Sequence, residues 1–234
     1  MKKLLIIGNW KANKNQFETQ EWFQKIADNL SGLSLENKEL VICVPFINVD
    51  VAKASVKKLN LPIKIGCQDV SKFENGAYTG EVTAEMLKGV VDYCIIGHSE
   101  RRKYFHETNE DVLEKLSLLL KNNIAPVLCI SDLSQFEFYV SKKPKIKELK
   151  EIIFVYEPPS AISGGKDYKP VSVETVSENL LKIKEVIGQG IRVLYGASIN
   201  SENAKSLFTK EEIDGGLSGQ ASLDPLHFLK IIDY

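Results

Sequence analysis

Short apolar runs rich in Val and Ile recur along the whole chain. Runs that are apolar at successive positions are typical of strands buried on both faces of a parallel sheet. The pattern therefore predicts eight strands, of which the last has the weakest composition: Lys3–Ile7, Leu40–Val44, Ile63–Cys67, Tyr93–Ile96, Pro126–Ile130, Ile152–Tyr156, Ile191–Tyr195 and Gly215–Ser218.

Amphipathic stretches with helical spacing lie between these runs. Phe17–Leu30, Asp111–Leu120 and Val173–Ile187 each place their apolar side chains on one stripe, and Ser172 can cap the third. Alternating strands and helices predict an α/β fold with a parallel sheet. In a chain of 234 residues, eight such units favour one closed (β/α)8 barrel domain over residues 1–234. A doubly wound open sheet is the structural alternative.

Composition and charge narrow the function classes. Apolar residues make up 44% and charged residues 26%, which is typical of globular proteins and argues against disorder. The 30 Lys and Arg balance 31 Asp and Glu, so a general nucleic-acid-binding protein is not expected. No apolar run approaches the roughly 18 residues of a membrane span. The apolar start ends at Gly8, too early for a signal peptide.

The cysteines indicate a reducing compartment. Cys43, Cys67, Cys94 and Cys129 each lie in or beside an apolar run, and no two form a Cys-x-x-Cys pair. We therefore expect buried reduced thiols and a cytoplasmic protein. The sequence contains no His, Cys and Asp set with metal-site spacing, so we expect neither a metal nor another cofactor.

Polar motifs follow the predicted strands, at the barrel end that carries the active site in this fold. Lys11 follows the first strand, where it is either solvated or directs its charge at an anionic substrate. His98 follows the fourth, where the start of a helix would keep its ring neutral. Glu157 follows the sixth; it is either a general base held by the adjacent prolines or a solvated carboxylate.

Small residues and long loops complete this end of the barrel. Tyr195–Asn200 and Ser218–Ser222 follow the last two strands, where phosphate commonly binds to backbone N–H groups. Gln68–Glu81 and Pro158–Pro170 are longer than ordinary loops after strands. Long loops in compact domains often serve as lids or bind partners.

Together these segments resemble the triosephosphate isomerase family over nearly the whole chain. The motifs that carry the resemblance are Gly-Asn-Trp-Lys-x-Asn at 8–13, Ile-Gly-His-Ser-Glu-Arg-Arg at 96–102 and Tyr-Glu-Pro at 156–158. The resemblance implies a TIM barrel. It implies an enzyme of glycolysis and gluconeogenesis that interconverts dihydroxyacetone phosphate and D-glyceraldehyde 3-phosphate through an enediolate.

The resemblance also implies individual roles. Glu157 is the base that moves a proton between two carbons, and neutral His98 exchanges a proton with the enediolate oxygens. Lys11 and Asn9 stabilise the developing negative charge, and Glu100 supports Lys11 and His98. Backbone groups near four residues would hold the phosphate: Ser163, Ser198, Gly219 and Gln220.

Two loops have implied roles as well. Pro158–Lys166 resembles the family's closing lid, which excludes water from the site. Gln68–Glu81 resembles the family's dimer-locking loop, so a homodimer is implied in which Thr79 contacts the partner's active-site region.

Several positions depart from the family pattern. The lid begins Pro158-Pro159-Ser160 instead of Pro-Val-Trp, so we expect it to move mainly at its other end, Lys166–Tyr168. Ser163, Ala197 and Gln220 stand where Gly is usual. The Ser131–Lys150 segment is shorter than in the family, so we expect the helix after the fifth strand to be broken or truncated.

Two other functions compete with the isomerase. One is a barrel that binds a phosphorylated ligand without turnover, as the substitutions in the lid and phosphate site would allow. The other is a different phosphosugar isomerase on the same fold, which would not be expected to share the segment at 97–102. The joint presence of Asn9, Lys11, His98, Glu100 and Glu157 favours the triosephosphate isomerase.

Overall fold

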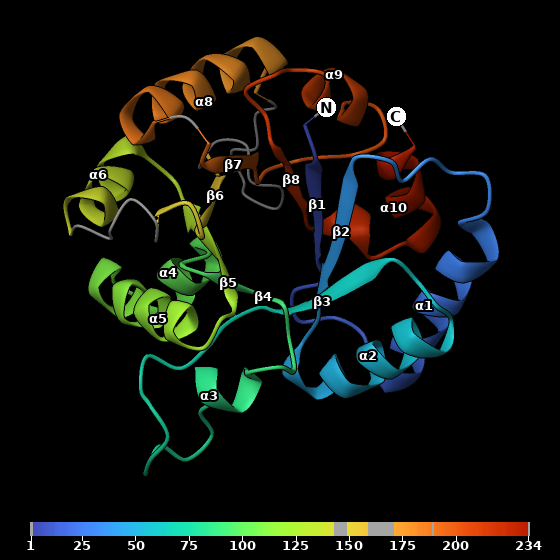
Figure 1. Ribbon diagram of the computed structural model, residues 1–234, viewed down its shortest axis with the longest axis horizontal. Helices are drawn as coiled ribbons and strands as arrows, with labels where there is room; N and C mark the ends of the chain where they lie inside the picture. Colours follow the sequence, from blue (N-terminus) through green and yellow to red (C-terminus); the bar gives the residue numbers. More distant parts are fainter. Residues whose placement is uncertain (1, 143–148, 159–170, 189, 234) are drawn as a thin grey trace.

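The computed structural model describes residues 2–142, 149–158, 171–188 and 190–233. Eight parallel strands form a closed barrel in sequence order (Figure 1). They are β1 (Leu4–Asn9), β2 (Lys38–Cys43), β3 (Ile63–Cys67), β4 (Tyr93–Ile96), β5 (Ala125–Ile130), β6 (Ile153–Tyr156), β7 (Arg192–Tyr195) and β8 (Gly215–Ser218). Leu5 of β1 lies opposite Gly215 of β8, which closes the barrel. The predicted (β/α)8 barrel is confirmed, and the open sheet is wrong.

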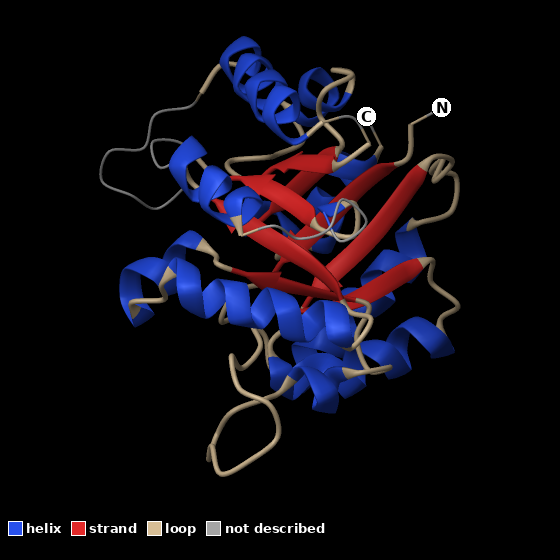
Figure 2. Cartoon of the chain, turned by 60° about the vertical axis from the view of Figure 1, so that its left-hand side comes forward, coloured by secondary structure: helices blue, strands red, loops and turns tan. Residues whose placement is uncertain are grey.

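Helices between the strands cover the outside of the barrel (Figures 1 and 2). They are α1 (Gln16–Asn29), α2 (Val49–Lys58), α3 (Ala84–Leu87), α4 (Ser99–Phe105), α5 (Asn109–Lys121), α6 (Leu133–Ser141), α8 (Val173–Ile187), α9 (Ala204–Phe208) and α10 (Pro225–Ile232), with 3-10 turns at Phe46–Asn48 and Gln220–Ser222. No helix within the described ranges has the length and apolar character needed to cross a membrane.

The continuous apolar runs are explained by burial on both strand faces. Leu5 and Val41 belong to the cluster inside the barrel, whereas their neighbours Ile6 and Ile42 belong to the cluster between barrel and helices. Because both faces are buried, alternation of apolar and polar residues is lost. The cysteines on these strands are free and buried, as predicted.

Most elements agree with the predicted ranges to within two residues. The main difference in the strands is β1, which continues to Asn9 and so carries that side chain to the barrel mouth. Ser172 caps α8 by accepting the Thr175 N–H, as predicted. The helix after β5, α6, has nine residues; residues 143–148 beyond it lie outside the described chain, so the expected break or truncation stays a prediction.

The loop between β3 and α3 projects away from the barrel and its helices (Figures 1 and 2). Contacts within the loop order it. The rings of Phe73 and Tyr78 stack with centroids 4.1 Å apart. Asn75 accepts a hydrogen bond from the Thr83 hydroxyl and donates one to Glu85.

The amino-terminal end of the barrel is held by a buried carboxylate. Glu39 of β2 accepts hydrogen bonds from Lys64 of β3 at 2.7 Å and from the Tyr93 hydroxyl of β4 at 2.6 Å. Its other oxygen lies 3.5 Å from Arg192 Nη1 on β7. Burial opposes ionisation, but these hydrogen bonds and the charges of Lys64 and Lys3 lower the pKa of Glu39 to about 2. One ionised carboxylate therefore links four strands.

Candidate active site

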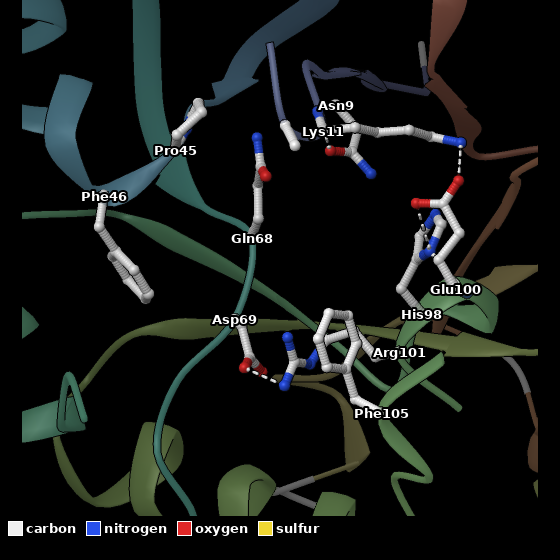
Figure 3. A pocket seen from close by; sticks show the side chains of 11 residues that line it. Asn9, Lys11, Pro45, Phe46, Gln68, Asp69, His98, Glu100, Arg101 and Phe105 are labelled. Atoms are coloured by element: carbon white, nitrogen blue, oxygen red, sulfur yellow. Dashed lines mark hydrogen bonds and ion pairs between the residues drawn. The ribbon is translucent and has the colours of Figure 1, made fainter. Parts of the chain in front are cut away.

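The end of β1 directs Lys11 across the barrel mouth. Asn9 Oδ1 accepts the backbone N–H of Lys11 at 3.0 Å. This turn holds Lys11 at φ 52°, a left-handed conformation that is uncommon for a lysine. The ammonium then reaches Glu100 Oε1 at 2.5 Å (Figure 3). Strained backbone of this kind is often found at functional sites, where the surrounding contacts maintain it.

His98 caps the start of α4, as the sequence predicts. Its Nδ1 accepts the Glu100 N–H at 3.2 Å. A nitrogen that accepts a hydrogen bond carries no proton, so this geometry assigns a neutral ring with the proton on Nε2. Nε2 lies 3.3 Å from Glu157 Oε1 and directs that proton into the mouth.

Glu157 is held at the end of β6 and is only 2% exposed. Its backbone N–H donates to the Ile130 carbonyl at 2.8 Å. Its side chain faces two donors, because Oε1 lies beside His98 Nε2 and Oε2 accepts the Ser99 N–H at 3.3 Å. A buried carboxylate needs such partners, so the side chain has a defined position.

Gly196, after β7, leaves room for that carboxylate. A Cβ at this position would lie 2.2 Å from Val155 Cγ1 and 2.9 Å from Glu157 Cγ. Any larger residue would therefore press directly on the Glu157 side chain.

Four of the predicted site residues share one pocket. Lys11, His98 and Glu157 line it together with Gly219, where a Cβ would lie 3.3 Å from Lys11 Cε. The other predicted phosphate contacts in the described chain lie beside this pocket: Ser198 is half-buried and Gln220 is exposed. Ser163 and the predicted lid beyond Pro158 lie outside the described residues.

A second pocket of about 330 Å³ opens beside the first (Figure 3). Asn9, Lys11, His98 and Glu100 line one side of it. The remaining lining residues are Ala12, Pro45, Phe46, Gln68, Asp69, Arg101 and Phe105. Lys11 and His98 therefore face both pockets.

Across the described ranges, no group of three or more His, Cys, Asp and Glu side chains is arranged to hold a metal ion.

The family profile for triosephosphate isomerase matches residues 4–234. The chain belongs to this family. It is 36% identical to the triosephosphate isomerase of Mesomycoplasma hyorhinis over 247 residues, which covers 99% of this chain and 98% of that protein. It is 36% identical to the enzyme of Alkaliphilus metalliredigens with full coverage of both, and 38% identical to that of Mesomycoplasma hyopneumoniae with 98% coverage of both.

As a triosephosphate isomerase, the protein interconverts the two triose phosphates and takes part in glycolysis. The alternative of a phosphate-binding barrel without turnover is not favoured. The barrel and the order of the motifs agree with what the resemblance implies.

One contact in this triosephosphate isomerase was not anticipated. The Ser99 N–H that holds Glu157 joins positions 58 residues apart. A pattern read along the chain cannot pair such positions. The only available signal was that Ser99 immediately follows His98 within the central motif.

Proposed function

We propose that Glu157 is the catalytic base of the isomerisation. The reaction removes a proton from a carbon beside a carbonyl, which requires a carboxylate in a fixed position. The observation that best supports this role is the 3.3 Å distance between Glu157 Oε1 and His98 Nε2, in a pocket that Lys11 also lines. The base Glu157 and the electrophiles His98 and Lys11 thus face the same small pocket.

We assign the stabilisation of the enediolate to three residues. Neutral His98 donates through Nε2–H and exchanges a proton between the two oxygens. Lys11 supplies a positive charge, and Asn9 contributes its amide N–H because its oxygen is used by the Lys11 backbone. Glu100 positions the Lys11 ammonium through their 2.5 Å contact.

The substrate phosphate is assigned to the side of the pocket formed after β7 and β8. The proposed donors are backbone N–H groups at Ser198, Gly219 and Gln220, with Ser163 contributing from the lid that excludes water. Gly219 supports this assignment because its lack of a side chain keeps space beside Lys11.

We further propose that the chain forms a homodimer through Gln68–Glu81. The projecting loop of one copy would enter the second pocket of the other and place Thr79 near Asn9 and Lys11. Exposed Phe46 and Phe105 at that pocket support this proposal, because apolar side chains there would be covered by the partner. The protein is proposed to work in the cytoplasm as one domain over residues 1–234, and its free buried cysteines suit a reducing compartment.

The base assignment is tested with dihydroxyacetone phosphate in an assay coupled to glyceraldehyde-3-phosphate dehydrogenase. We expect Glu157→Gln to lower kcat by about 10³-fold, since it removes the general base. His98→Gln is expected to act in the same direction, whereas His106→Gln, at the far end of α4, serves as the matched control with unchanged kcat. Wild-type turnover in Glu157→Gln would refute the assignment.

A further inference from the structure

Arg102 joins three helices to the end of β4. Its Nε donates to the Gly97 carbonyl at 2.8 Å, Nη1 to Asn109 Oδ1 at 2.7 Å and Nη2 to the Tyr139 hydroxyl at 2.8 Å. The Tyr139 hydroxyl in turn donates to Asn109 Oδ1 at 3.1 Å. A planar guanidinium with three directed hydrogen bonds has one orientation available.

The acceptor at the end of β4 is Gly97, which follows the strand and directly precedes His98. Gly97 has φ +66°, and a Cβ there would lie 2.8 Å from Arg102 Nη2 and 3.2 Å from the Cys129 carbonyl. Glycine is thus required both by backbone conformation and by the close approach of the guanidinium.

Arg102 also holds the peptide unit on the other side of His98. Its backbone N–H donates to the His98 carbonyl at 3.2 Å, while its side chain holds the Gly97 carbonyl. Peptide groups are planar, so fixing the two carbonyls fixes the backbone from which the imidazole leaves. The direction of Nε2 toward Glu157 therefore depends on Arg102.

Tyr139 supplies this support from α6. Its side chain is fully buried, and neighbouring Phe136 packs on Phe154 of β6 with ring centroids 4.9 Å apart. Burial raises the pKa of Tyr139, so the hydroxyl stays protonated and able to donate to Asn109.

We propose that Arg102, Asn109 and Tyr139 are positioning residues for His98: together they fix the Gly97–His98 peptide and thereby direct Nε2–H into the active site. This inference rests on the catalytic role proposed for His98. Through Tyr139, α6 thus contributes to the reaction without contacting the substrate.

The proposal is tested by measuring kcat and KM separately in two variants. Arg102→Lys keeps the charge but cannot form the three directed bonds, and we expect kcat to fall by about 10²-fold with KM changed less than twofold. Tyr139→Phe removes one acceptor and one donor, and we expect kcat to fall about fivefold. Tyr93→Phe is the matched control: it removes a buried hydroxyl at the opposite end of β4, so stability should fall and kcat should not.

A spectroscopic measurement separates positioning from folding. With 15N-labelled histidine, the Nε2–H resonance of His98 should shift or broaden in both variants, while the resonances of His106 and His227 stay in place. Unchanged kcat per folded molecule in Arg102→Lys, or an unmoved His98 resonance, would overturn the proposal. If His98→Gln itself kept wild-type kcat, the catalytic assignment would fail instead, which is a distinguishable outcome.

Discussion

Contacts with individual atoms fix the position of the Glu157 carboxylate. Glu157 has one oxygen beside His98 Nε2 and the other on the Ser99 N–H, and Gly196 lies against its Cγ position. These contacts come from the ends of two other strands, β4 for His98 and Ser99 and β7 for Gly196. The carboxylate is therefore placed by the barrel as a whole and not by its own loop.

Substituting Gly196 tests how closely the base is placed. Gly196→Ala introduces a Cβ that would lie 2.9 Å from Glu157 Cγ, so the carboxylate must move. A shift of about 1 Å can lower the rate by about 10²-fold, and we expect a fall of this order in kcat in the coupled assay. Gly188→Ala is the control: at φ +87° an alanine strains the backbone there, but its Cβ lies in open space and presses on no side chain, so kcat should stay unchanged. Equal kcat in wild type and Gly196→Ala would contradict this expectation.

The residue types of the site could be predicted, but their contacts could not. Lys11, His98 and Glu157 each stand after an apolar run, and parallel strands bring such ends together. The left-handed backbone of Lys11 arises from a local turn with Asn9 that no periodicity shows. The partners of Arg102 lie on other helices, and their positions depend on packing.

At the scale of elements, strands were more predictable than the segments between them. Burial on both faces leaves a continuous apolar signal, so β3, β4 and β8 begin and end at the predicted residues. Helix ends differ because capping residues lie outside the apolar stripe: Asn15 caps α1 and Thr108 caps α5. The expected break or truncation after β5 rests on the resemblance alone, and α6 itself ends at Ser141.

The projecting loop between β3 and α3 is the basis for the prediction that the chain forms a homodimer. We expect the wild-type protein at micromolar concentration to sediment at twice its chain mass of 26.2 kDa. Thr79→Arg places a bulky charge at the proposed contact, so it should shift the protein toward monomer and lower kcat by about tenfold or more, because the partner would no longer order Asn9 and Lys11. Thr209→Arg, an exposed threonine after α9, should leave both unchanged. A wild-type monomer, or a Thr79→Arg dimer with full kcat, would refute the loop's role.

At the scale of the molecule, the two ends of the barrel have separate tasks. The carboxyl end carries Lys11, His98 and Glu157. The amino end carries Glu39 and its cationic partners. Stability and reaction can therefore be altered independently.

Because Glu39 is ionised at the amino end of the barrel, we expect the free energy of unfolding to depend on pH. The pKa of Glu39 is lowered from 4.5 to about 2 in the folded protein. A lowered pKa stabilises the fold at pH values above 4.5, and this contribution is lost as pH falls from 4.5 toward 2. We expect Glu39→Gln to lower the free energy of unfolding by about 2 kcal/mol at pH 7, with kcat unchanged.

Denaturant unfolding at several pH values measures this difference. The gap between wild type and Glu39→Gln should narrow in acid, because the wild-type carboxyl becomes protonated and resembles the amide. Glu185→Gln on the exposed face of α8 should show no gap at any pH. A gap that stays constant down to about pH 2 would contradict the assignment to Glu39 ionisation.

The pairing of β1 with β8 has a consequence for how the chain assembles. Because β1 is synthesised long before β8, the hydrogen bonds between these two strands cannot form until β8 has left the ribosome. Until then β1 is an open sheet edge, and such edges recruit strands from other chains. Once closed, the barrel has no edge to offer. The closed barrel protects the native protein from pairing with other chains. The risk of aggregation is therefore greatest during synthesis, before the barrel closes.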